Sequence, residues 1–560
     1  MFASPGATNV TFVGSIQNDS WFEIYSCIDE RSAAYMACGM AAESGEPVVL
    51  SCTGATSSRN YMPALTEAYY RKLPILAVTS TQDVRKVGHM IAQVTDRSVK
   101  PNDVCVHAEY IPTCTDSTAE WDATIRINRA ILALKHHGGG PVHINLATVY
   151  SRNFSIKELP VARLIRRITV TDEFPKIQAK GRIAVFVGAH IRWSDRLTSS
   201  VDKFCSKFGA VVFCDHSSNY KGNFRVCNAI VGTQAYYKPE IYDIGLLIHI
   251  GEVSGDYADM RRFSQARQVW RVNEDGELRD QFRKLTNVFE MKEVEFFEHY
   301  AADCNEIQNT NTYLDECRNE YEALHTLIPE LPLSNLWIAQ HTADRLPENS
   351  VLHLGILNSL RAWNMFEIPK SVSSYVNTGG FGIDGLLSTC IGGALSDHGR
   401  IHFLVIGDLA FFYDMNALGN RHVGNNVRVL LVNNGKGTEF RNYNHIAAQF
   451  GNAADLYMAA AGHYGNKSHK LVRHYAEDLG YEYMQASTKE EYLDHLNRFL
   501  TPAVTEKPML LEVFTDNEDE STALKIMNTL FKDKSTEVKE KVKQIMPETV
   551  VNVLKKAMKK

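Results

Sequence analysis

Residues 401–440 read IHFLVIGDLAFFYDMNALGNRHVGNNVRVLLVNNGKGTEF, and two apolar runs stand out in this stretch. The first run, 401–406, leads into Asp408, and the second, 427–432, leads into Asn434. Short apolar runs of this kind are typical of buried strands, and the residues between them have the apolar spacing of a helix. The stretch therefore predicts a strand, a helix and a second strand, which is the crossover that two parallel strands need.

Polar side chains follow both predicted strands. Because ligands gather at the carboxyl ends of parallel strands, we expect Asp408 and Asn434 to point into one crevice. A carboxylate and an amide oxygen are ligands that suit a hard cation such as Mg²⁺. The alternative is an ordinary strand–turn–helix in which the aspartate only caps the helix.

Composition places the chain among globular proteins. Its 560 residues exceed the size of one core, and its 44% hydrophobic and 22% charged content is ordinary for a folded chain. A net charge of −6 gives no sign of a nucleic-acid partner. No apolar run is long enough to span a bilayer, and no signal-like segment begins the chain, so we expect no membrane association and a cytoplasmic location.

The cysteines support a reducing compartment. The chain has 11 of them without a CxxC pair or a zinc-like cluster. Cys38, Cys52, Cys214 and Cys390 lie in or beside apolar runs, so we expect small buried thiols.

Alternating strand and helix patterns predict an α/β fold with three doubly wound parallel-sheet domains. We expect these domains at 1–160, 175–325 and 331–531, followed by a charged amphipathic helical tail at 532–560. The expected strands are 48–52, 75–78, 142–146, 183–187, 211–214, 246–250, 269–272, 351–354, 403–406, 428–432 and 510–514. Helical patterns occupy 31–43, 61–71 and the charged segment 293–323.

A faint internal repeat relates the first domain to the third. The segment ACGMAA, 37–42, precedes Gly45 and the strand at 48–52. The segment TCIGGA, 389–394, precedes Gly399 and the strand at 401–406. The two domains therefore look like variations of one fold.

The Gly-Asp and Asn-Asn pattern resembles that of the thiamine diphosphate-dependent enzymes, in which it holds the Mg²⁺ that clamps the cofactor's diphosphate. The resemblance implies that Asp408, Asn434 and the backbone carbonyl of Lys436 bind the metal, although the spacing is one residue tighter than in close relatives. It also implies a pyrimidine-binding, a central and a diphosphate-binding domain. Only three residues precede Ser4, so we expect the first sheet to lack part of the family's first strand.

The same resemblance assigns Glu30 to the cofactor's pyrimidine ring, with which a carboxyl group must exchange a proton. By itself, Glu30 is better explained as a helix-start glutamate favoured by the dipole, and the cofactor role is preferred only together with the 401–440 stretch. In the family, the site is completed across a subunit interface, so we expect a homodimer or homotetramer. Further cofactor contacts are implied for Gly379, Gly382, Ile383, Leu409, Ala410, Gly435, Gly437 and Thr438, with Ile383 as the bulky residue beneath the bent cofactor.

Within this family, segments such as DERSAAYMACGMAAESGEP, GGGPVHINLA and NTGGFGIDG resemble the 2-succinyl-5-enolpyruvyl-6-hydroxy-3-cyclohexene-1-carboxylate synthases of menaquinone biosynthesis. Those enzymes bind polyanionic substrates through several arginines. Three of these arginines are replaced here, by Ala7-Thr8, Thr378 and Gln82. Arg361 remains, whereas an apolar pair after the glycine-rich loop becomes Glu439-Phe440.

Losing cations and gaining a carboxylate near the substrate pocket should disfavour a dicarboxylate substrate. We therefore expect decarboxylation of a less charged 2-oxo acid, with release of an aldehyde or transfer of the acyl carbanion to a carbonyl acceptor. Arg361, Glu439 and Phe440 are the expected substrate contacts, and His89 and Gln93 are candidates to reach the cofactor or substrate. Two alternatives stay open: the menaquinone-pathway synthase with displaced arginines, and a non-catalytic protein that keeps the fold for binding or assembly.

Overall fold

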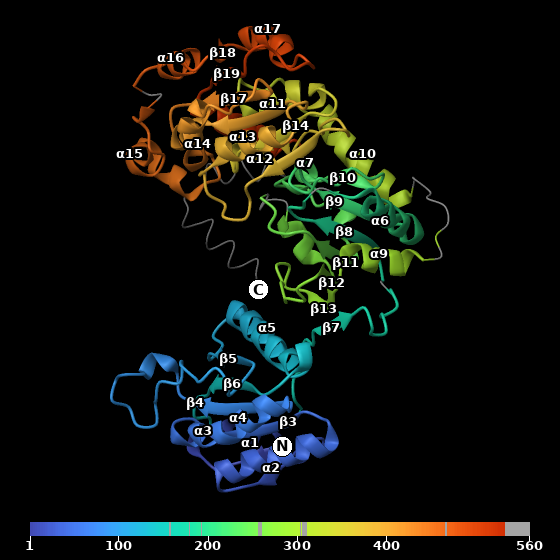
Figure 1. Ribbon diagram of the computed structural model, residues 1–560, viewed down its shortest axis with the longest axis vertical. Helices are drawn as coiled ribbons and strands as arrows, with labels where there is room; N and C mark the ends of the chain where they lie inside the picture. The colour runs from blue at the N-terminus through green and yellow to red at the C-terminus, as the bar shows by residue number, and fades with distance from the viewer. Residues whose placement is uncertain are drawn as a thin grey trace, which may run out of the picture. The chain divides into compact units, whose positions relative to one another are not determined.

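The computed structural model describes residues 1–155, 158–178, 180–191, 193–255, 260–302, 304, 311–464 and 467–531. The tail expected at 532–560 lies outside these residues. The chain divides into two compact units: Met1–Glu173 with Gly276–Glu290, and Phe174–Asp275 with the described residues from Met291 onward. Figure 1 shows both units as strands of parallel sheet covered by helices.

The first unit is built on a parallel sheet with the strand order β2-β1-β3-β4-β6-β5. Its strands are β1 (Phe2–Ala3), β2 (Tyr25–Ser26), β3 (Val48–Thr53), β4 (Ile75–Thr81), β5 (His107–Ile111) and β6 (Val142–Ala147). Its helices are η1 (Ala7–Asn9), α1 (Val10–Ile16), α2 (Glu30–Ser44), α3 (Thr56–Asn60), α4 (Met62–Arg71), η2 (Val84–Lys86), α5 (Ser117–Ala133) and η3 (His136–Gly138), where η marks a 3-10 helix. The unit also contains the parallel pair β7 (Arg166–Thr169) and β13 (Leu285–Glu290).

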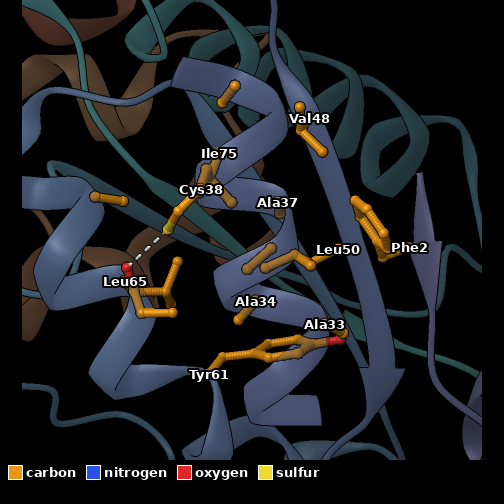
Figure 2. Close-up of a cluster of buried hydrophobic side chains, with 14 of the residues drawn as sticks. Phe2, Ala33, Ala34, Ala37, Cys38, Val48, Leu50, Tyr61, Leu65 and Ile75 are labelled. Carbon is orange, nitrogen blue, oxygen red and sulfur yellow. Dashed lines mark hydrogen bonds between the residues drawn. The ribbon is translucent and has the colours of Figure 1, made fainter. Parts of the chain in front are cut away.

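Helix α2 fixes the position of Glu30. Its start is capped by Asp29, whose side chain accepts hydrogen bonds from the backbone N–H groups of Arg31 and Ser32. The small residues on its inner face let the helix pack closely on β3, as Figure 2 shows for Ala33, Ala34 and Ala37 near Leu50. All three alanines are completely buried, so the helix start, and with it Glu30, is held by the core.

The second unit begins with strands in the order β10-β9-β8-β11-β12. These strands are β8 (Arg182–Val187), β9 (Val211–Cys214), β10 (Arg225–Cys227), β11 (Ile244–Ile250) and β12 (Gln268–Asn273). The helices around them are α6 (Asp195–Phe208), α7 (Ala229–Gly232), η4 (Glu240–Tyr242), η5 (Arg261–Gln265), α9 (Glu293–Ala301) and α10 (Thr312–Thr326). In the charged segment expected to be helical, the described residues form α9 and α10.

The last sheet has the order β15-β14-β16-β17-β19-β18. Its strands are β14 (Val351–Leu354), β15 (Ser373–Val376), β16 (His402–Gly407), β17 (Val427–Asn433), β18 (Glu482–Ala486) and β19 (Met509–Phe514). Its helices are α11 (Asn335–Thr342), η6 (Ala343–Arg345), α12 (Asn358–Trp363), α13 (Leu386–Ser396), α14 (Asp408–Asp414), η7 (Met415–Gly419), η8 (Thr438–Arg441), η9 (Ile446–Ala453), α15 (Ala454–Tyr457), α16 (Leu471–Asp478), α17 (Lys489–Phe499) and α18 (Asn517–Met527).

The first and last sheets share one topology, because numbering the strands of each in chain order gives the same spatial sequence, 2-1-3-4-6-5. This agreement supports the internal repeat found between 37–54 and 389–408. The predicted α/β class with parallel sheets is confirmed, since the strand pairs described in all three sheets are parallel. Among the described residues, every helix is too short or too polar to cross a membrane.

Candidate active site

Asp408 and Asn434 lie at the same edge of the last sheet, as the sequence predicts. Strands β16 and β17 run parallel, with Gly407 opposite Val432 in register. Asp408 is the first residue of α14, directly after β16, and Asn434 directly follows β17. The carboxyl ends of two neighbouring buried strands thus bring the two oxygen-bearing side chains together.

Neither side chain faces an opposite charge in the described part of the protein. Burial raises the pKa of Asp408 to about 7, although the backbone N–H groups of Leu409 and Gly435 act to lower it. Asp408 is only 4% exposed and forms no ion pair with a described residue. The side-chain oxygen of Asn434 is buried and has no hydrogen-bond partner among the same residues. Two such buried oxygens fit a hard cation, because the ion would provide a positive charge for Asp408 and a bonding partner for the Asn434 oxygen.

The loop after Asn434 has the shape of a ligand cradle. Gly435 has a φ of 77°, which favours glycine. The carbonyl of Lys436 accepts the Thr438 N–H at 2.9 Å and keeps a second lone pair for a metal. The Thr438 hydroxyl is buried and without a partner among the described residues. A Cβ at Gly437 would come within 3.2 Å of the Leu409 side chain, so only a glycine packs there without displacing it.

The glycine-rich segment expected to approach the cofactor lies between β15 and α13. Gly379 is exposed, and a Cβ there would meet nothing within 4 Å, so packing inside the chain does not explain this glycine. Near Gly382 an added Cβ would come closest to the flexible end of the Asp384 side chain. Ile383 is half-buried and packs against the core cluster that includes Ala410. The residues fit a cofactor loop, and their contacts with a cofactor stay a prediction.

Glu30 occupies a defined position in the first unit. Its side chain is half-buried, and its Oε2 accepts a hydrogen bond from the Asn60 amide at 3.0 Å. Burial raises its pKa, but hydrogen bonds from Asn60 and Ser57 outweigh this effect, and the net pKa is lowered. Neither partner was predicted from the sequence, because both lie on α3, about one helix and one strand away along the chain. Because Glu30 and Asp408 belong to different units, their meeting in one site stays a prediction.

The loop after β4 carries the other two catalytic candidates. His89 and Gln93 are exposed, and Gln93 has a left-handed φ of 63°. Their contact with a cofactor or substrate stays a prediction. Arg97 in the same loop was not predicted from the sequence. This arginine is 9% exposed, donates a 2.8 Å hydrogen bond to Thr79, and is packed against Gly54 at the carboxyl end of β3.

Two of the expected substrate residues, Arg361 and Glu439, form an ion pair with each other. The guanidinium of Arg361 donates to both carboxylate oxygens of Glu439, at 2.7 and 3.0 Å. Asn442 donates to Glu439 at 3.1 Å, and the Asn358 side-chain oxygen accepts from both Arg361 and Asn442 at 3.1 Å. Phe440 follows Glu439 and packs its ring edge-on against His445. The one arginine retained from the synthase pattern is therefore already occupied by a carboxylate of the same chain.

Comparisons with known proteins identify the family of the chain. The profile described as "Thiamine pyrophosphate enzyme, N-terminal TPP binding domain" matches residues 1–99. A 2-succinyl-5-enolpyruvyl-6-hydroxy-3-cyclohexene-1-carboxylate synthase of Phocaeicola vulgatus is 30% identical over 544 residues, covering 93% of each chain. The protein of the same name from Bacteroides fragilis is 29% identical, covering 93% of this chain and 94% of that one.

Among solved structures, a thiamine diphosphate-dependent 4-hydroxybenzoylformate decarboxylase of Rhodococcus jostii is similar, with 16% identity, a TM-score of 0.40, and coverage of 92% of this chain and 96% of that one. The match to the synthases extends over nearly the full length of both chains. The chain belongs to the thiamine diphosphate-dependent enzyme family and is similar, within it, to the 2-succinyl-5-enolpyruvyl-6-hydroxy-3-cyclohexene-1-carboxylate synthases.

Proposed function

We propose that this enzyme decarboxylates a 2-oxo acid and transfers the resulting acyl carbanion to a second substrate, with thiamine diphosphate and Mg²⁺ as cofactors. The first candidate substrates are 2-oxoglutarate and isochorismate, as in the menaquinone-pathway synthases. The observation that supports this pair is the 30% identity over 93% of both chains to a protein with that name. The comparisons therefore favour the synthase alternative over the first expectation of a less charged 2-oxo acid.

The proposed roles of the chain's residues follow from their positions. Thiamine diphosphate, when bound, supplies the carbanion chemistry. The oxygens of Asp408 and Asn434 and the carbonyl of Lys436 would hold the Mg²⁺ that neutralises the diphosphate. Glu30 would exchange a proton with a ring nitrogen of the pyrimidine, with Asn60 fixing the orientation of its carboxyl group.

A second candidate function is supported by the pairing of Arg361 with Glu439. An arginine whose two N–H groups already face a carboxylate offers less to a substrate carboxylate than an unpaired one. This favours a monocarboxylate 2-oxo acid such as pyruvate, with release of an aldehyde or transfer to a carbonyl acceptor. His89 and Gln93 are proposed to reach this substrate from the loop after β4.

A panel of 2-oxo acids, assayed with thiamine diphosphate and Mg²⁺ for release of CO₂, separates the candidates. Turnover of 2-oxoglutarate that depends on isochorismate and yields the joined product would support the first. Turnover of pyruvate or a similar monocarboxylate, with 2-oxoglutarate inert, would support the second. If no member of the panel turns over and calorimetry detects no cofactor binding, the chain is a binding or assembly protein and both proposals fail.

We also propose a homodimer or homotetramer with its active sites at subunit interfaces, in a reducing compartment such as the cytoplasm. The support for the oligomer is an exposed apolar group on and before α2, in which Ile28, Tyr35 and Met36 are 83%, 47% and 54% exposed. The support for the compartment is that Cys38, Cys52, Cys214 and Cys390 are buried free thiols. Light scattering of the purified enzyme would measure the mass, and a monomer would contradict the oligomer.

A further inference from the structure

Two adjacent histidines of the first unit converge on one carboxylate. The Nε2 atom of His136 lies 3.0 Å from Oε2 of Glu290, and the Nε2 atom of His137 lies 2.9 Å from its Oε1. The histidines belong to η3, which follows α5, and Glu290 ends strand β13, more than 150 residues later in the chain. One ligand atom from each of the three residues lies within 4.8 Å of the others.

The backbone takes an uncommon conformation to present both rings. Side chains of adjacent residues normally diverge, but here the imidazoles of His136 and His137 stack with centroids 3.7 Å apart. His137 has a left-handed φ of 49°, which is unusual for a residue other than glycine. The glycines that follow take up the rest of the turn, with φ values of 90° at Gly138 and 66° at Gly139. Local strain of this kind is a feature of functional sites.

The three side chains differ in exposure in a way that would let an ion enter the site from solvent. Glu290 is 13% exposed and His136 is 22% exposed, whereas His137 is 74% exposed. The carboxylate and the inner imidazole are therefore shielded, and the outer imidazole faces solvent, from which an ion can arrive. The cluster lies in the first unit and uses none of the residues assigned to the cofactor.

We propose that Nε2 of His136, Nε2 of His137 and the carboxylate of Glu290 form a binding site for a divalent ion of the zinc class, with water as the fourth ligand. Imidazole and carboxylate are ligands of Zn²⁺, at metal–ligand distances of about 2.0–2.2 Å. Tetrahedral geometry at that distance separates ligand atoms by about 3.3 Å. The three ligand atoms, which lie within 4.8 Å of one another, would therefore have to approach each other by no more than about 1.5 Å when the ion enters.

Arg167 lies beside Glu290 and should lower the affinity of this site for a cation. Its Nε lies 3.4 Å from Oε2 of Glu290 and also donates to the carbonyl of Gly276 at 3.3 Å. The guanidinium approaches the carboxylate beside the histidines and already satisfies part of its charge. Because like charges repel, Arg167 should weaken binding of a cation at Glu290 without blocking it. Removing this charge should therefore tighten the site.

The test uses the full-length enzyme stripped with a chelator and then saturated with thiamine diphosphate and Mg²⁺, so that the other metal site is filled. Zinc binding is measured by equilibrium dialysis of the wild type, His137→Asn and Glu290→Gln. Asparagine is chosen because it tolerates a left-handed φ, and Gln keeps the volume of Glu290. His474→Ala, which removes an exposed histidine of α16, is the matched control.

We expect the wild type and His474→Ala to bind one more zinc ion per chain than His137→Asn and Glu290→Gln. Arg167→Gln should bind this ion several-fold more tightly than the wild type, and Co²⁺ in its place should give the visible absorption of a tetrahedral site. Equal zinc stoichiometry in the wild type and both ligand variants would overturn the proposal. So would an Arg167→Gln variant that binds zinc more weakly, because the cluster would then be an ordinary network of hydrogen bonds around Glu290.

Discussion

Replacing Glu439 by leucine would test whether the chain's own carboxylate limits its choice of substrate. In the structure, Glu439 accepts two hydrogen bonds from Arg361, at 2.7 and 3.0 Å, in the geometry that a substrate carboxylate would use. Both side chains are mostly buried, with 23% of Arg361 and 18% of Glu439 exposed, so solvent screens the pair only in part. A substrate carboxylate that uses the same two N–H groups of Arg361 must displace Glu439.

The size of the expected change in substrate preference follows from this exchange of one carboxylate for another. Hydrogen bonds to charged groups contribute about 1.5–3 kcal/mol each. In the wild type, the hydrogen bonds that a substrate carboxylate makes with Arg361 are offset by those that Glu439 must give up. In Glu439→Leu there is no internal carboxylate to displace, so a dicarboxylate is favoured by roughly 1.4–2.8 kcal/mol over a monocarboxylate, which is a preference of about 10-fold to 100-fold.

The assay is the ratio of kcat/KM for 2-oxoglutarate to that for pyruvate, followed by CO₂ release at saturating thiamine diphosphate and Mg²⁺. We expect this ratio to rise about 10-fold to 100-fold in Glu439→Leu and to change less in Glu439→Gln, whose carbonyl can still accept from Arg361. The matched control is Glu518→Gln, which removes the 76% exposed partner of Arg441 and should leave the ratio unchanged. A ratio that stays within twofold of wild type in Glu439→Leu would refute the reasoning, because Arg361 would then have no part in substrate binding.

Three further changes test other features of the site and the fold. Glu30→Gln should lower turnover by at least about 100-fold while calorimetry still detects Mg²⁺-dependent cofactor binding, and retained turnover would show that Glu30 has another role. Asp408→Asn should leave the cofactor-free protein as stable as the wild type or more so, since a buried unpaired carboxylate is removed, but should abolish the rise in Tm that thiamine diphosphate and Mg²⁺ cause; a normal rise would remove Asp408 from the metal site. Burial lowers the pKa of His216 from 6.5 to about 4, so the unfolded chain takes up the proton first and stability should fall by about 3 kcal/mol as the pH drops from 6.5 to 4. When the urea midpoint is measured against pH, His216→Gln should lack this part of the decrease. Parallel plots of midpoint against pH for the wild type and His216→Gln would contradict the role given to His216.

The sequence predicted the buried strands well because strands covered on both faces of a parallel sheet are continuous apolar runs. Strand β16 was expected at 403–406 and spans His402–Gly407, and β17 was expected at 428–432 and spans Val427–Asn433. Polar residues directly after such runs must lie at the carboxyl edge. The positions of Asp408 and Asn434 therefore followed from local pattern alone.

Short and peripheral strands gave no such signal. Strand β2 is two exposed residues, Tyr25 and Ser26, and it forms only because its backbone pairs with β1. Strand β10 has three residues, and its pairing with β9 is equally non-local. Their partner strands lie more than ten residues away along the chain, and the sequences of these two short strands contain neither an apolar run nor an alternating pattern.

Side-chain partners were also beyond local pattern. The amide of Asn60 reaches Glu30 from 30 residues away, and Arg361 meets Glu439 across 78 residues. The sequence identified Arg361 and Glu439 separately, one as a remaining cation and the other as an added anion. It gave no information that the two form an ion pair, because that depends on how α12 and η8 pack at the same edge of the sheet.

At the carboxyl edge of the last sheet, the pair Asp408 and Asn434 and the pair Arg361 and Glu439 therefore differ in what they require from a ligand. At Asp408 and Asn434 the buried oxygens have no counter-charge among the described residues, so a cation adds contacts that these residues alone do not make. At Arg361 and Glu439 the charges are already paired, so an anion only exchanges one carboxylate for another. Under the proposed function, affinity for the metal and cofactor can be high while discrimination among 2-oxo acids depends on the small difference between an internal and an external carboxylate. Substitution of Glu439 should then change the substrate preference of this enzyme and leave the side chains of Asp408 and Asn434 in place.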